Sequence, residues 1–273
     1  MNSELAYSWC GERLEEHSHK TSEIFKLTFE DRIIKTLSGR LNYKFNDVGK
    51  FIIRLIPLLH DIGKSHVQYQ NTIKFKERCP KTAIICRECK DKPNFSWHEV
   101  LSAQLCWRVI EDLLFNLSLY DRFKNLQEIA TASILFHHQG IRAIESETPL
   151  KEINLKEYLN ETLYTLLPKL IDIAHYGLKL DGHLIREIVS SALQELESDL
   201  KSTRSLKGLS TRILNELRTA PKNYLKLYSI TAGPLVICDW IAARVLRIQN
   251  HYHYSPMLNE AVYSFPELET YLK

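Results

Sequence analysis

The sequence predicts an all-α protein that folds as a single bundle-like domain. Apolar residues recur at helical spacing along most of the 273 residues, and no alternation of apolar and polar residues typical of strands persists. Glycine and proline, nine of each, are sparse for a fold rich in β-turns. Helices that each carry one apolar face bury those faces against one another, so we expect a helical bundle spanning residues 1–273.

Two helices are expected near the N-terminus. Residues 11–28 place apolar side chains at i, i+3 and i+4 spacing, and His17 lies on the same face. A second, strongly apolar helix is expected over 46–60, because Asn46 is a good N-terminal cap and Gly63 suits a helix stop.

The next two helices cover residues 96–119 and 126–138. The first opens at "SWHE", where Ser96 and Glu99 match a capping box. Further helices are expected over 153–176, 181–199, 208–218 and 231–249, the last with Pro234 in its first turn. Between the helices we expect an irregular cysteine-containing insertion, a loop and a basic connector, over 65–95, 141–152 and 201–226.

The composition favours an intracellular protein. Hydrophobic residues make up 44% and charged residues 25%, as in ordinary globular domains, and a net charge of +3 does not by itself indicate nucleic-acid binding. The N-terminal segment lacks the apolar core of a signal peptide, and no run of about 18 apolar residues predicts a membrane span. We therefore expect a cytoplasmic protein without a membrane contact.

Seven histidines and aspartates fall on apolar helix faces. A single histidine there is usually a hydrogen-bonded core residue, and a single buried aspartate is costly, so each would need its own partner. One shared partner, a divalent cation, satisfies all of them. The seven candidate ligands are His17, His60, Asp61, His98, His137, His138 and Asp239.

This ligand set suits particular metals. Imidazole with carboxylate is typical of Mn, Fe, Ni, Co or Zn, whereas Mg usually prefers oxygen. Asp61 is placed to bridge two metals through its two oxygens. His138 is either a ligand or a neighbour of the site, because consecutive helical residues point about 100° apart and two ligands in a row require the helix to end there.

The ordered set H…HDxGK…H…HH…D, with "HDIGK", "SWHE" and "FHH", resembles the HD nuclease of the CRISPR type I interference helicase–nuclease. That nuclease belongs to the metal-dependent HD phosphohydrolase superfamily. The resemblance implies a helical HD fold and cleavage of single-stranded DNA, within a CRISPR effector complex, by attack of a metal-bound water. It implies two divalent ions, drawn from Mn, Ni, Co, Fe or Mg.

The resemblance also implies roles for individual residues. One metal would take His17, His60, Asp61 and Asp239, and the other would share Asp61 and take His98, His137 and His138. Asp61 and Lys64 would be catalytic, with Lys64 holding the scissile phosphate as a point charge. Alternatively, Lys64 is a solvated helix-end lysine that neutralises exposed carbonyls.

Many members of that family continue into a helicase. This sequence ends soon after Asp239 and contains no G-x-x-x-x-G-K-[ST] phosphate loop. We therefore expect a standalone nuclease subunit that acts with a separate helicase subunit. The alternatives are an HD phosphohydrolase acting on a nucleotide or cyclic nucleotide, and a non-enzymatic subunit with a structural metal.

The segment 201–226 is strongly basic, with seven Lys and Arg residues against one Glu. A cleft wall of that charge attracts a phosphate backbone, and a solvated connector is the equally weighted alternative. The candidate nucleic-acid contacts are Lys201, Arg204, Lys207 and Arg212. Tyr69, Phe75 and Trp97 lie near the motifs as candidate base-stacking residues, although core packing suits Trp97 better.

Three cysteines cluster in the insertion. Cys86 and Cys89 form a C-x-x-C motif, and Cys79 precedes them. A structural zinc site would need a fourth ligand, such as Cys10 or Cys106, and a disulfide or free thiols are the alternatives. The six cysteines are too few and scattered for a secreted disulfide scaffold.

Overall fold

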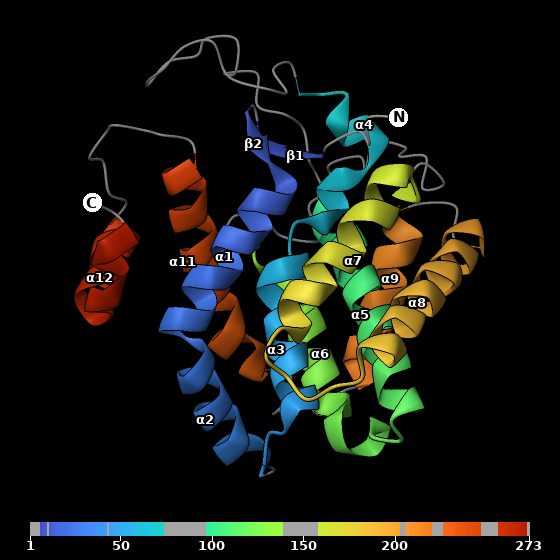
Figure 1. Cartoon of the computed structure of the whole chain (residues 1–273), viewed down its shortest axis with the longest axis horizontal. Helices are drawn as coiled ribbons and strands as arrows, with labels where there is room; N and C mark the ends of the chain where they lie inside the picture. The colour runs from blue at the N-terminus through green and yellow to red at the C-terminus, as the bar shows by residue number, and fades with distance from the viewer. Residues whose placement is uncertain are drawn as a thin grey trace.

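The predicted all-α fold is confirmed. A computed structural model describes residues 6–9, 11–42, 44–73, 97–138, 158–202, 206–219, 226–246 and 256–271. Nearly all of them are helical, and their strands form one small two-stranded sheet (Figure 1). The helices pack around a central one, α3 (Asp47–Leu59). It contacts α1 (Leu14–Thr28), α5 (His98–Asn116), α6 (Tyr120–Phe136), α7 (Glu161–His175) and α11 (Ser229–Leu246).

The first element among the described residues is a β-hairpin that the sequence does not predict. β1 (Tyr7–Trp9) pairs antiparallel with β2 (Glu12–Arg13), and Gly11 takes a positive φ of 71° in the turn. The expected helix over 11–28 therefore begins later, as α1 (Leu14–Thr28). A further unpredicted helix, α2 (Glu30–Leu41), follows and buries Ile33 and Leu37.

The central helix is α3 (Asp47–Leu59), which agrees with the helix expected over 46–60. Asn46 caps it as expected, since its side-chain oxygen accepts from the amide of Gly49 at 3.1 Å. Almost every residue of α3 is buried, which suits a helix surrounded by other helices. The 3₁₀-helix η1 (Ile62–Ser65) follows it. The short α4 (Val67–Gln70) then lies within the segment 65–95 that the sequence predicts to be irregular, so part of that segment is helical.

Gly63 has a different role from the helix stop that the sequence suggests. It lies inside η1, and a Cβ atom there would lie only 2.1 Å from the carbonyl oxygen of His98. Its amide donates to Oγ of Ser102 at 2.9 Å. Glycine is therefore required because η1 packs directly against the backbone of the helix that carries His98.

Two long helices, α5 (His98–Asn116) and α6 (Tyr120–Phe136), form the other side of the core. α7 (Glu161–His175) begins at a cap on Asn160, which accepts from the amide of Leu163 at 3.0 Å. α8 (Gly182–Ser202) and α9 (Leu206–Thr219) pack on α5. The predicted basic connector is thus largely helical, and the predicted loop 141–152 lies outside the described residues.

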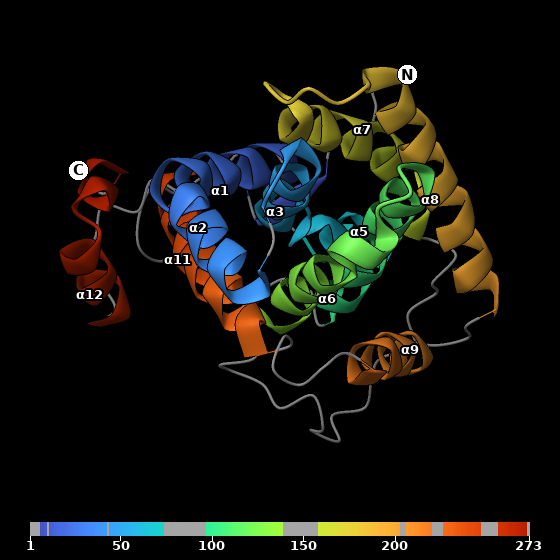
Figure 2. The ribbon, with the colours of Figure 1, turned by 90° about the horizontal axis from the view of Figure 1, so that it is seen from below.

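The last part of the chain contains η4 (Lys226–Tyr228), α11 (Ser229–Leu246), α12 (Pro256–Ser264) and η5 (Pro266–Tyr271). α11 packs along α1, and α12 lies at one side of the molecule (Figure 2). The segment Lys226–Leu246 is long and apolar enough to cross a membrane. That is weak support for a span, since core helices meet the same criterion and α11 carries Asp239 to the interior.

Candidate metal centre

The fold brings all seven predicted ligands together. They come from the start of α1 and the middle of α11, from the first residue of α5, and from the residues that directly follow α3 and α6. Their ligand atoms form two groups, and within each group every atom lies within 4.8 Å of the others. The first group is His17, His60, Asp61 and Asp239, and the second group is Asp61, His98, His137 and His138.

The first group is arranged around two carboxylates. Nε2 of His17 lies 2.9 Å from Oδ1 of Asp239 and 3.4 Å from Oδ2 of Asp61. Nε2 of His60 lies 3.5 Å from the same Asp61 oxygen and 3.6 Å from Oδ1 of Asp239. Two imidazole nitrogens and two carboxylate groups therefore face one another at nitrogen–oxygen distances of 2.9 to 3.6 Å, an arrangement that suits one metal ion bound among them.

The second group uses the other oxygen of Asp61. Oδ1 of Asp61 lies 2.8 Å from Nε2 of His98 and 3.8 Å from Nε2 of His137. The ring of His138 lies beside that of His137, with centroids 3.9 Å apart and the planes tilted by 40°. α6 ends at Phe136, so both histidines can turn inward. Because each oxygen of Asp61 faces a different group, its carboxylate has the orientation of a bridging ligand.

Backbone carbonyls orient two of the histidines. Nδ1 of His60 lies 2.8 Å from the carbonyl oxygen of Pro57, and Nδ1 of His137 lies 2.6 Å from that of Ile134. Both carbonyls belong to the last turn of a helix, where they have no helical partner. Each contact uses the Nδ1 atom and so turns Nε2 of the same ring toward the cluster. Histidines that bind a metal through one ring nitrogen commonly have the other nitrogen fixed by a hydrogen bond in this way.

Two glutamates occupy the equivalent position behind the other histidines. Oε1 of Glu12 lies 2.5 Å from Nδ1 of His17, and Oε2 of Glu99 lies 3.4 Å from Nδ1 of His98. Burial lowers the pKa of His17, but the charges of Glu12 and Asp239 outweigh it and raise that pKa to about 9.

The predicted capping box of Glu99 is not described, because Ser96 lies outside the described residues.

The aspartates are held ionised. Burial raises the pKa of Asp61, but the positive charge of Lys64 and the neighbouring His60 outweigh it, and the pKa lies well below its ordinary value. Burial likewise raises the pKa of Asp239, and the facing rings of His17 and His60 reverse the shift, so that this pKa also lies well below its ordinary value. Two buried carboxylates therefore retain their negative charge, which favours cation binding.

The donor atoms also fit a metal. Nε2 of His60, Nε2 of His137 and Oδ1 of Asp61 are buried, and none makes a hydrogen bond of ordinary geometry within the described residues. Burial, reinforced by neighbouring histidines, lowers the pKa of His138 to about 2, so its ring is neutral. Burying polar nitrogen and oxygen atoms without a partner costs folding free energy, and a divalent ion bound to all of them removes that cost.

The family model described as "Cas3, HD domain" matches residues 11–245, a span that contains all seven ligands and Glu12. The chain belongs to the Cas3 HD domain family. Membership makes it a metal-dependent phosphohydrolase or nuclease that acts on nucleic acid in a CRISPR system. Comparisons with curated proteins and with solved structures found no match.

In this Cas3 HD domain Lys64 is not a solvated helix-end lysine. It lies in η1, is almost buried, and its ammonium group pairs with Oδ2 of Asp61. A positive charge therefore lies beside the carboxylate that both groups share. Contact between Lys64 and a scissile phosphate stays a prediction.

The predicted nucleic-acid contacts of the Cas3 HD domain lie away from this cluster in the sequence, and two of the four have acidic partners. Lys201 pairs with Glu197 at 2.7 Å, and Arg212 pairs with Asp199. Lys207 belongs to α9, and Arg204 lies outside the described residues. Binding of nucleic acid by these residues stays a prediction.

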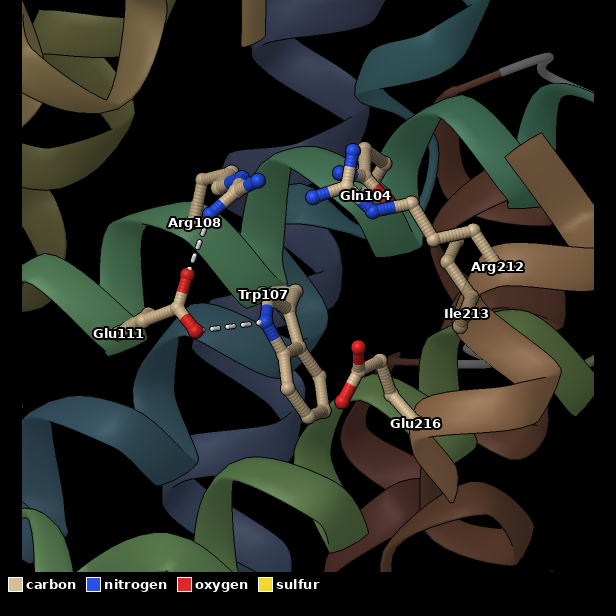
Figure 3. Close-up of a pocket in the computed structure, with 7 residues that line it drawn as sticks. All are labelled: Gln104, Trp107, Arg108, Glu111, Arg212, Ile213 and Glu216. Atoms are coloured by element: carbon tan, nitrogen blue, oxygen red, sulfur yellow. Dashed lines mark hydrogen bonds and ion pairs between the residues drawn. The ribbon is translucent and has the colours of Figure 1, made fainter. Parts of the chain in front are cut away.

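Arg212 lines a small polar cavity between α5 and α9 (Figure 3). The cavity has about 40 Å³ of internal space, enough for a few water molecules but not for a nucleotide. Its other lining residues are Gln104, Trp107, Arg108, Glu111, Ile213 and Glu216. The cavity is therefore part of a structural polar network.

The aromatic and cysteine predictions have mixed outcomes. Tyr69 is buried, so its ring presents no open face to a base, and Trp97 packs partly against the core. Phe75 and the proposed zinc ligands Cys79, Cys86 and Cys89 lie outside the described residues. Structural zinc therefore stays a prediction, while Cys106 is a buried free thiol.

Proposed function

We propose that this Cas3 HD domain cleaves single-stranded DNA in CRISPR interference, using two divalent ions. The observation that carries the proposal is Asp61, whose Oδ2 faces the histidines of the first group and whose Oδ1 faces those of the second. A carboxylate shared in this way suits two neighbouring metals. The first group would hold one ion and the second group the other.

The residues around the ions have separable roles in this proposal. When bound, a pair of ions activates water and stabilises the leaving oxygen of a phosphodiester. Asp61 belongs to both binding groups and so sets their positions relative to each other. The carbonyl of Pro57 fixes the ring of His60, and that of Ile134 fixes the ring of His137. Lys64 adds a positive charge beside Asp61, suited to neutralising a bound phosphate.

Donor chemistry favours a transition metal over magnesium. The two groups contain five imidazoles and two carboxylates. Nitrogen-rich sites of this kind prefer Mn, Fe, Co or Ni, whereas magnesium prefers oxygen ligands. We therefore propose that Mn²⁺, Co²⁺ or Ni²⁺ supports activity better than Mg²⁺.

A separate helicase subunit and an intracellular location complete the proposal. These 273 residues contain no phosphate-loop motif and so do not themselves supply ATP-driven opening of a duplex. We propose that a separate helicase subunit, which hydrolyses ATP, supplies it. Co-purification of the tagged protein from its host, followed by mass spectrometry and an ATPase assay, tests this assignment. Recovery of the CRISPR complex without any ATPase would contradict it.

The central experiment uses metal-depleted protein and four labelled substrates: single-stranded DNA, duplex DNA, single-stranded RNA, and nucleotides including cyclic ones. We expect Mn²⁺ to restore cleavage of single-stranded DNA in the wild type and in Asp31→Asn, which changes an exposed aspartate of α2. Asp61→Asn should remain inactive. Turnover of a nucleotide with intact DNA would instead establish the nucleotide phosphohydrolase.

A further inference from the structure

A buried carboxylate outside the predicted ligand set touches the metal centre. Glu12 belongs to β2, and its Oε1 lies 2.5 Å from Nδ1 of His17. Both side chains are about 1% exposed. Burying a carboxylate is costly, so this placement needs a specific partner, and the outer nitrogen of His17 is that partner.

The position of His17 explains why a side chain is needed there. His60 and His137 follow helix ends, where free carbonyls accept from their Nδ1 atoms. His17 instead lies within α1, where the nearby carbonyls already accept the hydrogen bonds of the helix. An acceptor for its Nδ1 must therefore come from another element, and β2 supplies it.

The hairpin that carries Glu12 is anchored to the rest of the site. Gln70 of α4 bonds to both backbone groups of Tyr7 in β1, each at 2.9 Å, and donates to the carbonyl of Lys64 at 2.6 Å. The amide of Leu14 also donates to the carbonyl of Ala6 at 2.9 Å. These hydrogen bonds connect the hairpin to the segment that contains Lys64. The connection holds Glu12 in place behind His17.

We propose that Glu12 is a positioning residue for the first metal group. Its carboxylate keeps Nδ1 of His17 protonated and directs Nε2 toward Asp239 and Asp61, without itself binding the metal. This proposal rests on the two-group metal assignment of the proposed function. It extends the functional set to a residue that acts through His17.

Mn²⁺ titration of metal-depleted protein, followed by calorimetry or by the electron paramagnetic resonance of free Mn²⁺, tests the proposal. Outer partners of metal-binding histidines typically contribute 10- to 100-fold in metal affinity. We therefore expect Glu12→Ala to weaken Mn²⁺ binding to the first group by about that factor. Glu12→Gln should lose about 3- to 10-fold, because its amide oxygen still accepts from Nδ1 but carries no charge. The matched control is Glu128→Gln, a buried glutamate of α6, which should bind Mn²⁺ like the wild type.

A second measurement separates positioning from general support of the fold. In the Zn²⁺-loaded wild type, the ¹⁵N signals of the His17 ring should show a protonated Nδ1 and a metal-bound Nε2. Glu12→Ala should alter this pattern, while circular dichroism shows an unchanged helical content. If Glu12→Ala does not fold, the isosteric Glu12→Gln is used for the Mn²⁺ titration, where the loss of charge should still weaken binding.

Either of two results would overturn the proposal. One is a folded Glu12→Ala, or Glu12→Gln where the alanine variant is unfolded, with Mn²⁺ affinity within twofold of the wild type. The other is a His17 ring signal that Glu12→Ala leaves unchanged. Neither readout uses DNA, so a wild type that binds Mn²⁺ but cleaves no substrate contradicts the proposed function and leaves the role of Glu12 intact.

Discussion

Replacing Gly63 with alanine should damage both the fold and the metal centre. The added Cβ would lie 2.1 Å from the carbonyl oxygen of His98 and 2.9 Å from its carbonyl carbon. Ordinary contacts begin at about 3.4 Å, so the backbone of η1 or α5 must move by about 1.3 Å. Both atoms belong to rigid backbone, so a rotation of one side chain cannot relieve the overlap.

The expected cost follows from the size of this displacement. Overpacking of a filled core costs about 1 to 3 kcal/mol, and a contact with backbone belongs at the upper end. A loss of about 3 kcal/mol lowers the melting temperature of a domain of this size by about 6 to 12 °C. The movement also separates Nε2 of His98 from Oδ1 of Asp61, now 2.8 Å apart, so Mn²⁺ binding should weaken.

Thermal unfolding and Mn²⁺ titration measure the two effects, with Gly39→Ala as the matched control. Gly39 lies in α2 with nothing within 4 Å of an added Cβ, so alanine should be neutral or stabilise by about 0.5 to 1 kcal/mol. If Gly63→Ala melted and bound Mn²⁺ like the wild type, the inferred close approach of η1 and α5 would be wrong.

Three further predictions concern the charges of the site and of the polar network. Asp61→Asn should weaken Mn²⁺ binding by more than about 100-fold, because both groups lose the shared carboxylate; calorimetry measures this. Mn²⁺ at a hundred times its dissociation constant should stabilise the wild type by about 2.7 kcal/mol, seen as a higher melting temperature that EDTA reverses. Asp199→Ala should destabilise the protein by about 2 kcal/mol and leave Mn²⁺ affinity unchanged, because Gln104 and Arg108 donate to Asp199 at 2.7 to 3.0 Å.

Each of these predictions has a contrary outcome. Tight Mn²⁺ binding by Asp61→Asn would remove the basis for a bridging carboxylate. An unchanged melting temperature with saturating Mn²⁺ would mean that the ion does not bind preferentially to the folded protein. A weaker Mn²⁺ affinity in Asp199→Ala would show that the polar network and the metal centre are coupled.

Helices with strong apolar patterns and clear caps were the predictable part of the fold. The boundaries of α3 follow from the Asn46 cap and from a run of apolar residues that suits a helix buried on all sides. α2 was missed because only a narrow stripe, with Ile33 and Leu37, is buried among charged residues. The β-hairpin was missed because two such short strands depend on distant partners, among them Gln70.

The sequence by itself determined which atoms are available at the centre. Seven imidazoles and carboxylates on apolar faces, with an HD pair at the end of a buried helix, identified the ligand set, because such groups need a shared partner when buried. The resemblance already implied how they divide into two groups, and only the tertiary structure supplies the distances that bring each group together. The two oxygens of Asp61 face different histidines because five separate segments pack around it.

The same limit explains why Glu12 was not predicted. Within "GERLEEH", Glu12 has the same local character as Glu15 and Glu16, and no local pattern distinguishes it. It is buried, whereas those two are not, because the hairpin bends back over α1 and Gln70 holds it there. Residue types and helix faces are local properties that the sequence specifies, whereas burial and distance depend on contacts between residues far apart in the chain.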